Sequence, residues 1–211
     1  MTANRRQLLI GGAAAGLAST APALAWAAAS GPVANPKLAK LLDAFVEEIL
    51  AESPEMATSL GLDKGPRAAL KSQLSDASEA GRNREIAAYA DRKARLEAID
   101  RKSLSGRDLT LYDTVGYAMG LGAEGGRFAY GTDGANPYVV TQQDGAIANR
   151  PEFLNAQHII ESKADADAYL ARLEALARVV DQETDRVAAD AGRGVVPPDF
   201  LLATALTQMT A

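Results

Sequence analysis

The sequence of 211 residues predicts an all-α protein, an irregular multi-helix bundle built around one long helix. From about residue 162 to 191, apolar side chains recur in steps of three and four, which places them on one face of a helix. The same spacing returns in segments that begin at Pro36, Ser105 and Asp199. Hydrophobic residues make up 47% of the chain, enough for the buried core of one domain of ordinary size.

Both ends of the long helix are marked in the sequence. Ser162 can cap its first turn, and Asp165 puts an acid where the helix dipole favours negative charge. Gly192 and Gly194 end the pattern ahead of two consecutive prolines. About thirty residues at 1.5 Å each give a rod of roughly 45 Å. We therefore expect the other apolar segments to pack along this helix.

The segment that begins at Pro36 is predicted to form a helix, an elbow and a short second helix. Proline suits the first helical turn, and the residue before Pro54 is pushed out of helical geometry, so Ser53 caps the second helix. Residues 79–102 form a charged helical pattern in which basic residues alternate with acids. That interleaving favours a solvated face over a ligand-binding patch.

Three glycines, Gly116, Gly120 and Gly122, interrupt the helix that begins at Ser105. Each lowers the stability of a helix interior, but each also lets another backbone approach closely. No Lys-Ser or Lys-Thr pair follows them, so the sequence favours close packing over a phosphate-binding loop.

Residues 125–161 lose helical periodicity and are rich in glycine and proline, which predicts a long loop. Their aliphatic and aromatic side chains are too numerous to remain in water. We therefore expect an ordered loop that lies over the helices, with a short extended segment near residues 138–141.

The amino terminus has the pattern of an export signal. Arg5 and Arg6 precede a mild apolar run, and small residues at 23–29 offer cleavage sites, which resembles the twin-arginine signal of bacteria. Pro22 breaks the run, which falls short of about 20 strongly apolar residues, so removal is favoured over a membrane anchor. We expect delivery to the periplasm by the twin-arginine export machinery. The predicted parts are a signal peptide at 1–29, a linker at 30–35 and a helical domain at 36–211.

Charge and composition exclude several classes of function. The chain carries 22 basic and 27 acidic residues without a basic stripe, which argues against nucleic acid as a partner. It has no cysteine, and His158 is its only histidine, so neither a thiolate nucleophile nor a His-x-x-x-His zinc pair is possible within it. We expect His158 to be a structural hydrogen-bonding residue and expect no metal ligand. No catalytic residue is predicted.

Glu183 falls in the apolar register of the long helix. A salt bridge at the helix rim with Arg186 or Arg178 is the favoured interpretation, and a buried acid is the alternative.

Five segments, taken in order, carry a family resemblance. They are Ser53–Gly61, Asn136–Gln142, Pro151–Leu154 with Gln157 and His158, Ala168–Leu173, and Gly194–Pro198. Together they resemble the amino-terminal third of the exported bacterial proteins grouped as domain of unknown function 885. Members of that family are all-helical, are longer than this chain, and look like zinc metallopeptidases.

The resemblance implies that this chain is the amino-terminal portion of a peptide hydrolase-like protein. The family's presumed zinc motif, His-Glu-x-x-Pro-Gly-His, is absent here, so zinc is expected only in a full-length relative and the chain alone is expected to be inactive. Whether it contributes to catalysis in a longer protein is left open. On the same resemblance, Asn136, Tyr138, Gln142 and His158 are hypothesised to border a channel for peptide substrates.

The alternative is a non-catalytic periplasmic helical domain for binding or scaffolding. The last helix separates the two hypotheses, because its apolar residues, among them Phe200, Leu206 and Met209, lack a predicted partner in this chain. Exposed apolar surface of this kind indicates a missing carboxy-terminal region or a partner that covers it.

Overall fold

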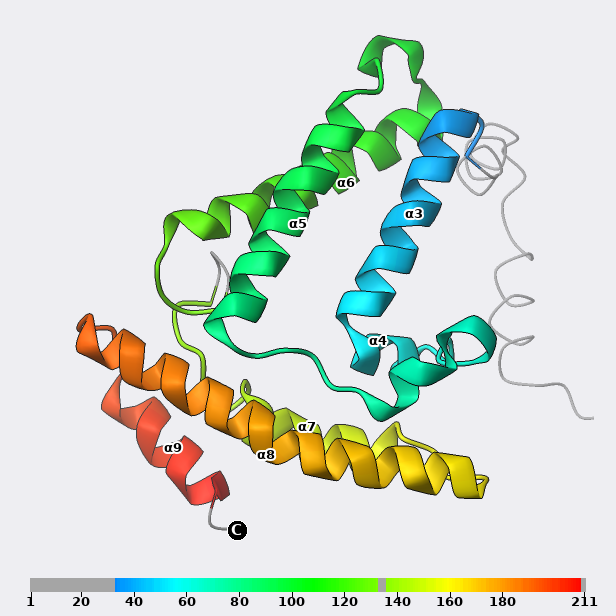
Figure 1. The fold of residues 1–211 in the computed structure, drawn as a ribbon. Coiled ribbons are helices and arrows are strands. Elements are labelled where there is room, and N and C mark those ends of the chain that lie inside the picture. Colours follow the sequence, from blue (N-terminus) through cyan, green and yellow to red (C-terminus); the bar gives the residue numbers. More distant parts are fainter. Residues whose placement is uncertain (1–32, 133–135, 210–211) are drawn as a thin grey trace, which may run out of the picture.

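The structure, a computed structural model, describes residues 33–132 and 136–209 (Figure 1). These residues are helical, with no strand in either range, so the predicted all-α multi-helix class is confirmed. The α-helices are α3 (Pro36–Glu52), α4 (Pro54–Ser59), α5 (Glu79–Glu97), α6 (Gly106–Glu124), α7 (Ala146–Ala156), α8 (Lys163–Gly192) and α9 (Asp199–Met209). Short 3-10 helices are η1 (Gly65–Ser72), η2 (Arg101–Ser103) and η3 (Gly125–Arg127). Arg5, Arg6 and the predicted signal lie outside the described residues.

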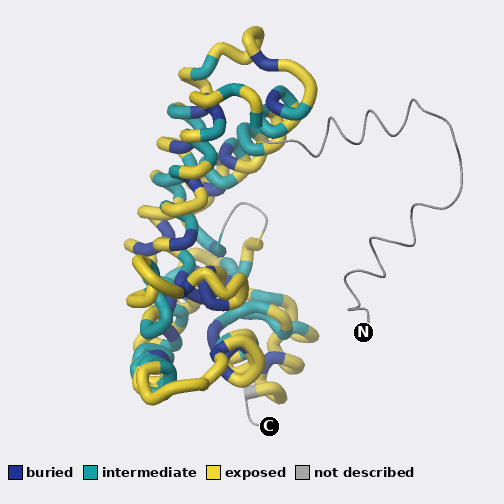
Figure 2. Tube along the Cα trace, turned by 90° about the vertical axis from the view of Figure 1, so that its right-hand side faces the viewer, coloured by how far each residue is buried: buried dark blue, intermediate teal, exposed yellow. Residues whose placement is uncertain are grey.

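The helices fall into two groups that lie one above the other in Figure 1. We call α3, α5 and α6 the upper helices, and α4, η1, α7, α8 and α9 the lower helices. Figure 2, turned by 90°, shows buried positions in both groups along an elongated molecule. None of the helices in the described ranges is both long and apolar enough to cross a lipid bilayer.

The upper helices share an aliphatic core made by Leu38, Phe45, Leu96 and Leu104. The ring of Tyr89 on α5 lies so close to α6 that a Cβ added to Gly122 would come within 2.4 Å of it. The prediction of close packing is confirmed at this glycine, where the approaching group is a side chain.

Carboxylates of α3 and arginines of α5 join two of the upper helices. Arg92, only 1% exposed, bonds through Nε to Glu48 Oε2 at 3.0 Å and through Nη2 to Glu52 Oε1 at 2.5 Å. Arg95 forms two parallel bonds to Glu48, at 2.8 and 2.6 Å, and together the two arginines lower the pKa of Glu48 to about 2. The predicted solvated face of α5 is therefore wrong at Arg92, because α3 supplies two carboxylates for it.

The lower helices pack around Leu74, Ala146, Phe153, Leu154 and Val179. The long helix α8 begins and ends within one residue of its predicted limits, and its capping residue accepts a hydrogen bond at the first turn as expected.

The predicted loop 125–161 holds a helix that the sequence analysis missed, α7, and it begins with η3. Pro151 lies inside α7, which explains why the segment has little helical periodicity. Its buried Phe153 and Leu154 pack against α8, and this contact stabilises a helix that the local sequence does not favour. Residues 138–141 form no strand, and the chain bends at Val139 within the segment that was predicted to be extended.

Two arginines, one from each group of helices, bind the segment that connects the two groups. Arg82 of α5 donates to the carbonyls of Gly125 at 3.1 Å and Phe128 at 2.6 Å. Arg186 of α8 donates to the Gly131 carbonyl in the same connection and to Ala77 O at 3.2 Å. The segment from 125 to 132 is thus fixed from both sides.

Candidate functional site

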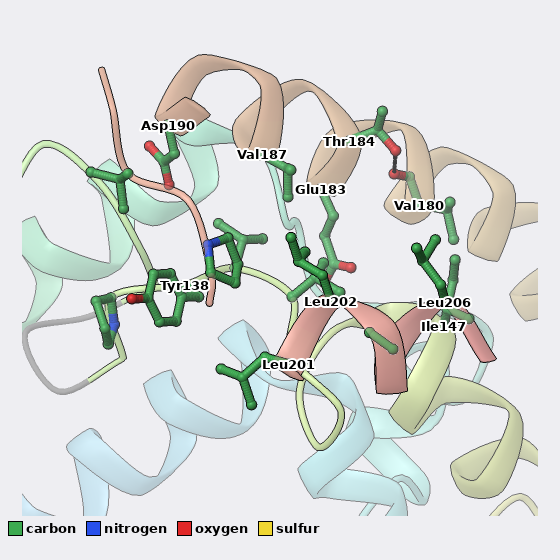
Figure 3. Close-up of a pocket in the computed structure, with 16 residues that line it drawn as sticks. Tyr138, Ile147, Val180, Glu183, Thr184, Val187, Asp190, Leu201, Leu202 and Leu206 are labelled. Atoms are coloured by element: carbon green, nitrogen blue, oxygen red, sulfur yellow. Dashed lines mark hydrogen bonds between the residues drawn. The ribbon is translucent and has the colours of Figure 1, made fainter. Parts of the chain in front are cut away.

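An apolar groove of about 210 Å³ lies between α8, α9 and the segment 137–140, and is closed at one end by α7. Its lining residues are Pro137, Tyr138, Val139, Val140, Ile147, Val180, Glu183, Thr184, Val187, Asp190, Val195, Pro197, Leu201, Leu202, Ala205 and Leu206. In Figure 3, Tyr138 and Asp190 lie toward one end of this groove and Ile147 and Leu206 toward the other, with Glu183 between them.

The groove exists because the chain reverses after α8. Gly194 has a φ of 83°, a left-handed conformation that glycine adopts readily, and Pro197 follows it, so α9 returns beneath α8 (Figure 1). The small residue Ala205 is the buried contact of α9. Leu206, which also lines the groove, is 61% exposed, and Phe200, outside the lining, is 70% exposed.

Two acids are the charged residues of the groove lining. Asp190 is occupied, since Oδ2 accepts from the Gly131 amide at 2.9 Å and Oδ1 accepts from Arg193 at 3.0 Å. Glu183 Oε2 accepts from the amide of Ala146, the first residue of α7, at 2.6 Å. Within the described ranges its second oxygen, Oε1, has no hydrogen-bond or ion-pair partner.

Burial raises the pKa of Glu183 above its usual value, although the Ala146 amide and the charges of Arg150 and Arg186 act in the opposite direction. The predicted salt bridge of Glu183 with Arg186 or Arg178 is wrong. Arg186 donates to backbone carbonyls, and Arg178 donates to Gln182 at 3.3 Å.

Only one of the four hypothesised channel residues, Tyr138, lines the groove. Asn136 is exposed beside it, and its carbonyl accepts from the Thr132 amide at 3.0 Å. Gln142 is half-buried outside the groove lining, and its Oε1 is enclosed without a partner in the described part of the chain. His158 lies in a different cluster, so the structure does not bring the four together.

His158 is buried and both of its ring nitrogens are engaged. Nδ1 accepts from Arg172 at 2.9 Å, which leaves Nε2 as the donor to the Asp165 carbonyl at 3.0 Å. Burial, with the charge of Arg172, lowers the pKa of His158. This geometry agrees with a structural hydrogen-bonding residue.

Zinc does not fit the described residues. The nitrogen lone pair of His158 already accepts a hydrogen bond, and no group of three potential ligands, whether histidine, aspartate or glutamate, occurs in the described ranges. No reaction step through a metal is therefore assigned to the described residues.

Arg172 is the centre of the cluster that contains His158, and sequence analysis missed it. The side chain is completely buried and donates to Thr58 Oγ1 at 2.7 Å and to the carbonyls of Gln73 at 2.9 Å and Leu70 at 3.1 Å. Its guanidinium also lies over the Phe153 ring, 4.9 Å from the centroid. A signal was present, since Arg172 follows Tyr169 by three residues on the apolar side of α8.

Comparison with known proteins gives one match, to a family. No curated protein and no solved structure matches the chain. The sequence model of the family described as "Bacterial protein of unknown function (DUF885)" matches residues 54–211, a range that includes the whole groove lining and the Arg172 cluster. The chain therefore belongs to the DUF885 family of bacterial proteins.

Proposed function

We propose that this chain is the exported, peptide-binding helical region of a peptide hydrolase-like protein, and that it binds apolar peptide segments without hydrolysing them alone. The observation that carries the proposal is the apolar groove between α8 and α9. The peptide-hydrolase part rests on the family resemblance, and export to the periplasm rests on Arg5 and Arg6.

The size and rim of the groove suit a peptide side chain. A dry cavity of about 150 Å³ holds benzene, so a groove of about 210 Å³ has room for the side chain of phenylalanine or leucine. The exposed part of Leu206, in the groove lining, offers an apolar contact to a neighbouring peptide residue. In a longer protein the same rim would be the surface against which a further region packs.

A second candidate is a self-sufficient periplasmic binding or scaffold domain. It is favoured by the fact that α7, α8, α9, the segment 137–140 and the connection between α8 and α9 form the groove without a further region. Both candidates place the peptide in the same groove, and they differ in whether hydrolysis by a zinc site elsewhere follows binding.

Calorimetric titration of the full chain tests the proposal. Phe-Gly-Gly-amide and its acetylated form are the apolar probes, and Gly-Gly-Gly-amide is the control peptide. At about 0.3 kcal/mol per non-hydrogen atom, the apolar probes should bind with a Kd on the order of 0.1 mM. Failure of both apolar probes to bind more tightly than the glycine peptide would remove the proposal.

A matched pair of variants locates the binding site. Thr184→Trp places a large ring in the groove lining and should abolish binding, whereas Asp185→Trp, at an exposed position outside the lining, should not. Cell fractionation with lysine in place of Arg5 and Arg6 tests export, since retention in the cytoplasm is expected only for a twin-arginine signal.

A further inference from the structure

We propose that the groove recognises the free amino terminus of its peptide, with the terminal ammonium on Glu183 Oε1 and the first side chain in the apolar part. This inference rests on the proposed function and deepens it, because it specifies which end of a peptide the groove takes. The chemical class of ligand is then a peptide, or a small amine, that carries an apolar group next to a primary ammonium.

The charge of the groove selects a cation. Glu183 and Asp190 are both acidic, and none of the other lining residues is basic. An occupant with a carboxylate next to its apolar group would meet only like charge there. An occupant with an ammonium group would meet the opposite charge, in surroundings where burial strengthens the attraction.

The two acids are not equivalent, and the difference identifies the contact. Both oxygens of Asp190 are taken, one by the Gly131 amide and one by Arg193. Among the residues that the structure describes, only the Ala146 amide holds Glu183, through Oε2, and Oε1 keeps its acceptor capacity. A carboxylate that is oriented by one bond and free at the other oxygen needs little rearrangement to receive an ammonium.

The position of Glu183 places an apolar side chain beside that contact. In Figure 3 the side chain of Glu183 reaches from α8 toward Leu202 of α9, with Val180 and Leu206 on one side of it. An ammonium at Glu183 therefore puts the substituent of the adjacent carbon among aliphatic side chains of α8 and α9. Burial raises the pKa of Glu183, the charges of Arg150 and Arg186 oppose that rise, and an ammonium at Oε1 would oppose it further by favouring the ionised carboxylate.

The test compares Phe-Gly-Gly-amide with acetyl-Phe-Gly-Gly-amide, two probes that differ in the terminal charge. Because a hydrogen bond to a charged group contributes more than a neutral one, the free amine should bind the full chain about tenfold more tightly at pH 7. Glu183→Gln preserves the shape and an acceptor for Ala146, and it should make the two affinities equal. Glu174→Gln, an exposed acid on the same helix, should keep the tenfold preference.

A measurement on the unaltered protein covers the case in which Glu183→Gln fails to fold. Raising the pH to about 9.5 neutralises a terminal amine, whose pKa is about 7.7 to 8.0, so the preference for the free amine should disappear. Equal binding of both probes at pH 7 would overturn the amino-terminus inference and leave the groove as a peptide site. If neither probe binds, the proposed function is overturned as well.

Discussion

Each group of helices contains one arginine that is at most 1% exposed, and the two arginines are satisfied by different partners. Arg92, in the upper helices, faces the carboxylates of Glu48 and Glu52. Arg172, in the lower helices, faces carbonyls, a hydroxyl and an imidazole, and it has no ion pair within the described ranges. Burial lowers the pKa of Arg172, whereas the carboxylates raise the pKa of Arg92.

The difference in partners determines how much stability the protein loses when each arginine is removed. The side chains of Glu48 and Glu52 are 34% and 43% exposed, so water can solvate them when their partner is removed. Carbonyls such as Gln73 O, and the hydroxyl of Thr58, lie around a completely buried guanidinium and depend on it as a donor. Both groups have an apolar core, but only in the lower helices do buried acceptors depend on the arginine as their donor.

The largest effect is expected from Arg172→Met, which keeps an unbranched apolar side chain and removes the donors. Leaving several acceptors unsatisfied should cost about 3 to 5 kcal/mol of unfolding free energy, even though a buried charge is also removed. Urea unfolding measures this loss. Arg178→Met, an exposed control on the same helix, should change stability by less than about 0.5 kcal/mol. A small loss for Arg172→Met would break the comparison.

A smaller effect is expected from Arg92→Met in the upper helices. Arg95 still binds Glu48, and water reaches Glu52, so the loss should be about 1 to 2 kcal/mol. Because the lost interaction is ionic and partly exposed, the difference from the unaltered chain should shrink between about 0.1 and 1 M NaCl. The loss caused by Arg172→Met should not respond to salt, and equal salt responses would contradict the contrast between the two centres.

The smallest expected effect is a difference in pH dependence. His158 has a lowered pKa, so its contribution to stability is complete above about pH 6.5 and is lost as the pH falls below that value. Glu48, with a pKa lowered from 4.5 to about 2, contributes fully above pH 4.5 and loses its contribution between pH 4.5 and 2. Acidification should therefore weaken the lower helices first.

Hydrogen exchange resolves the two steps by region. Between pH 6.5 and 5, protection factors should fall in α8 and remain unchanged in α5. The raised pKa of Glu183 has the opposite effect on stability, because the native state binds a proton at a higher pH than the unfolded state and is stabilised as the pH falls. The variant His158→Asn is therefore needed as a reference. The loss of protection in α8 between pH 6.5 and 5 should be absent from His158→Asn. An identical loss in that variant would mean that a group other than His158 causes it.

Local signals in the sequence were enough for the elements whose ends are chemically marked. Ser162 and Gly192 delimit α8, and Pro36 opens α3, because caps and prolines act on the residues beside them. The exposed apolar side of α9, at Phe200 and Leu206, was also expected from the same kind of pattern.

Features that depend on distant partners were not predicted. Formation of α7 is supported by Glu183, which accepts a hydrogen bond from the Ala146 amide, 37 residues away in the sequence. No local sequence pattern indicates such a contact. Arg172 likewise reaches Gln73, 99 residues away. The groove forms only when α9 folds back on α8, so no local pattern in the sequence predicts it. Tyr138 was identified as a candidate by family resemblance alone, and Glu183 was assigned to the wrong interaction.

Because the long helix helps to hold the segment from 125 to 132, a movement of the helix at that contact displaces side chains further along it. Arg186 and Arg172 are fourteen residues apart on α8, about 21 Å along a rigid axis. A rotation of about 5° at Arg186 therefore moves Arg172 by about 2 Å, which is enough to break its 2.7 Å bond to Thr58. The contact of Arg186 with the Gly131 carbonyl and the hydrogen bonds of Arg172 to α4 and η1 must therefore form together, because one rigid helix carries both arginines.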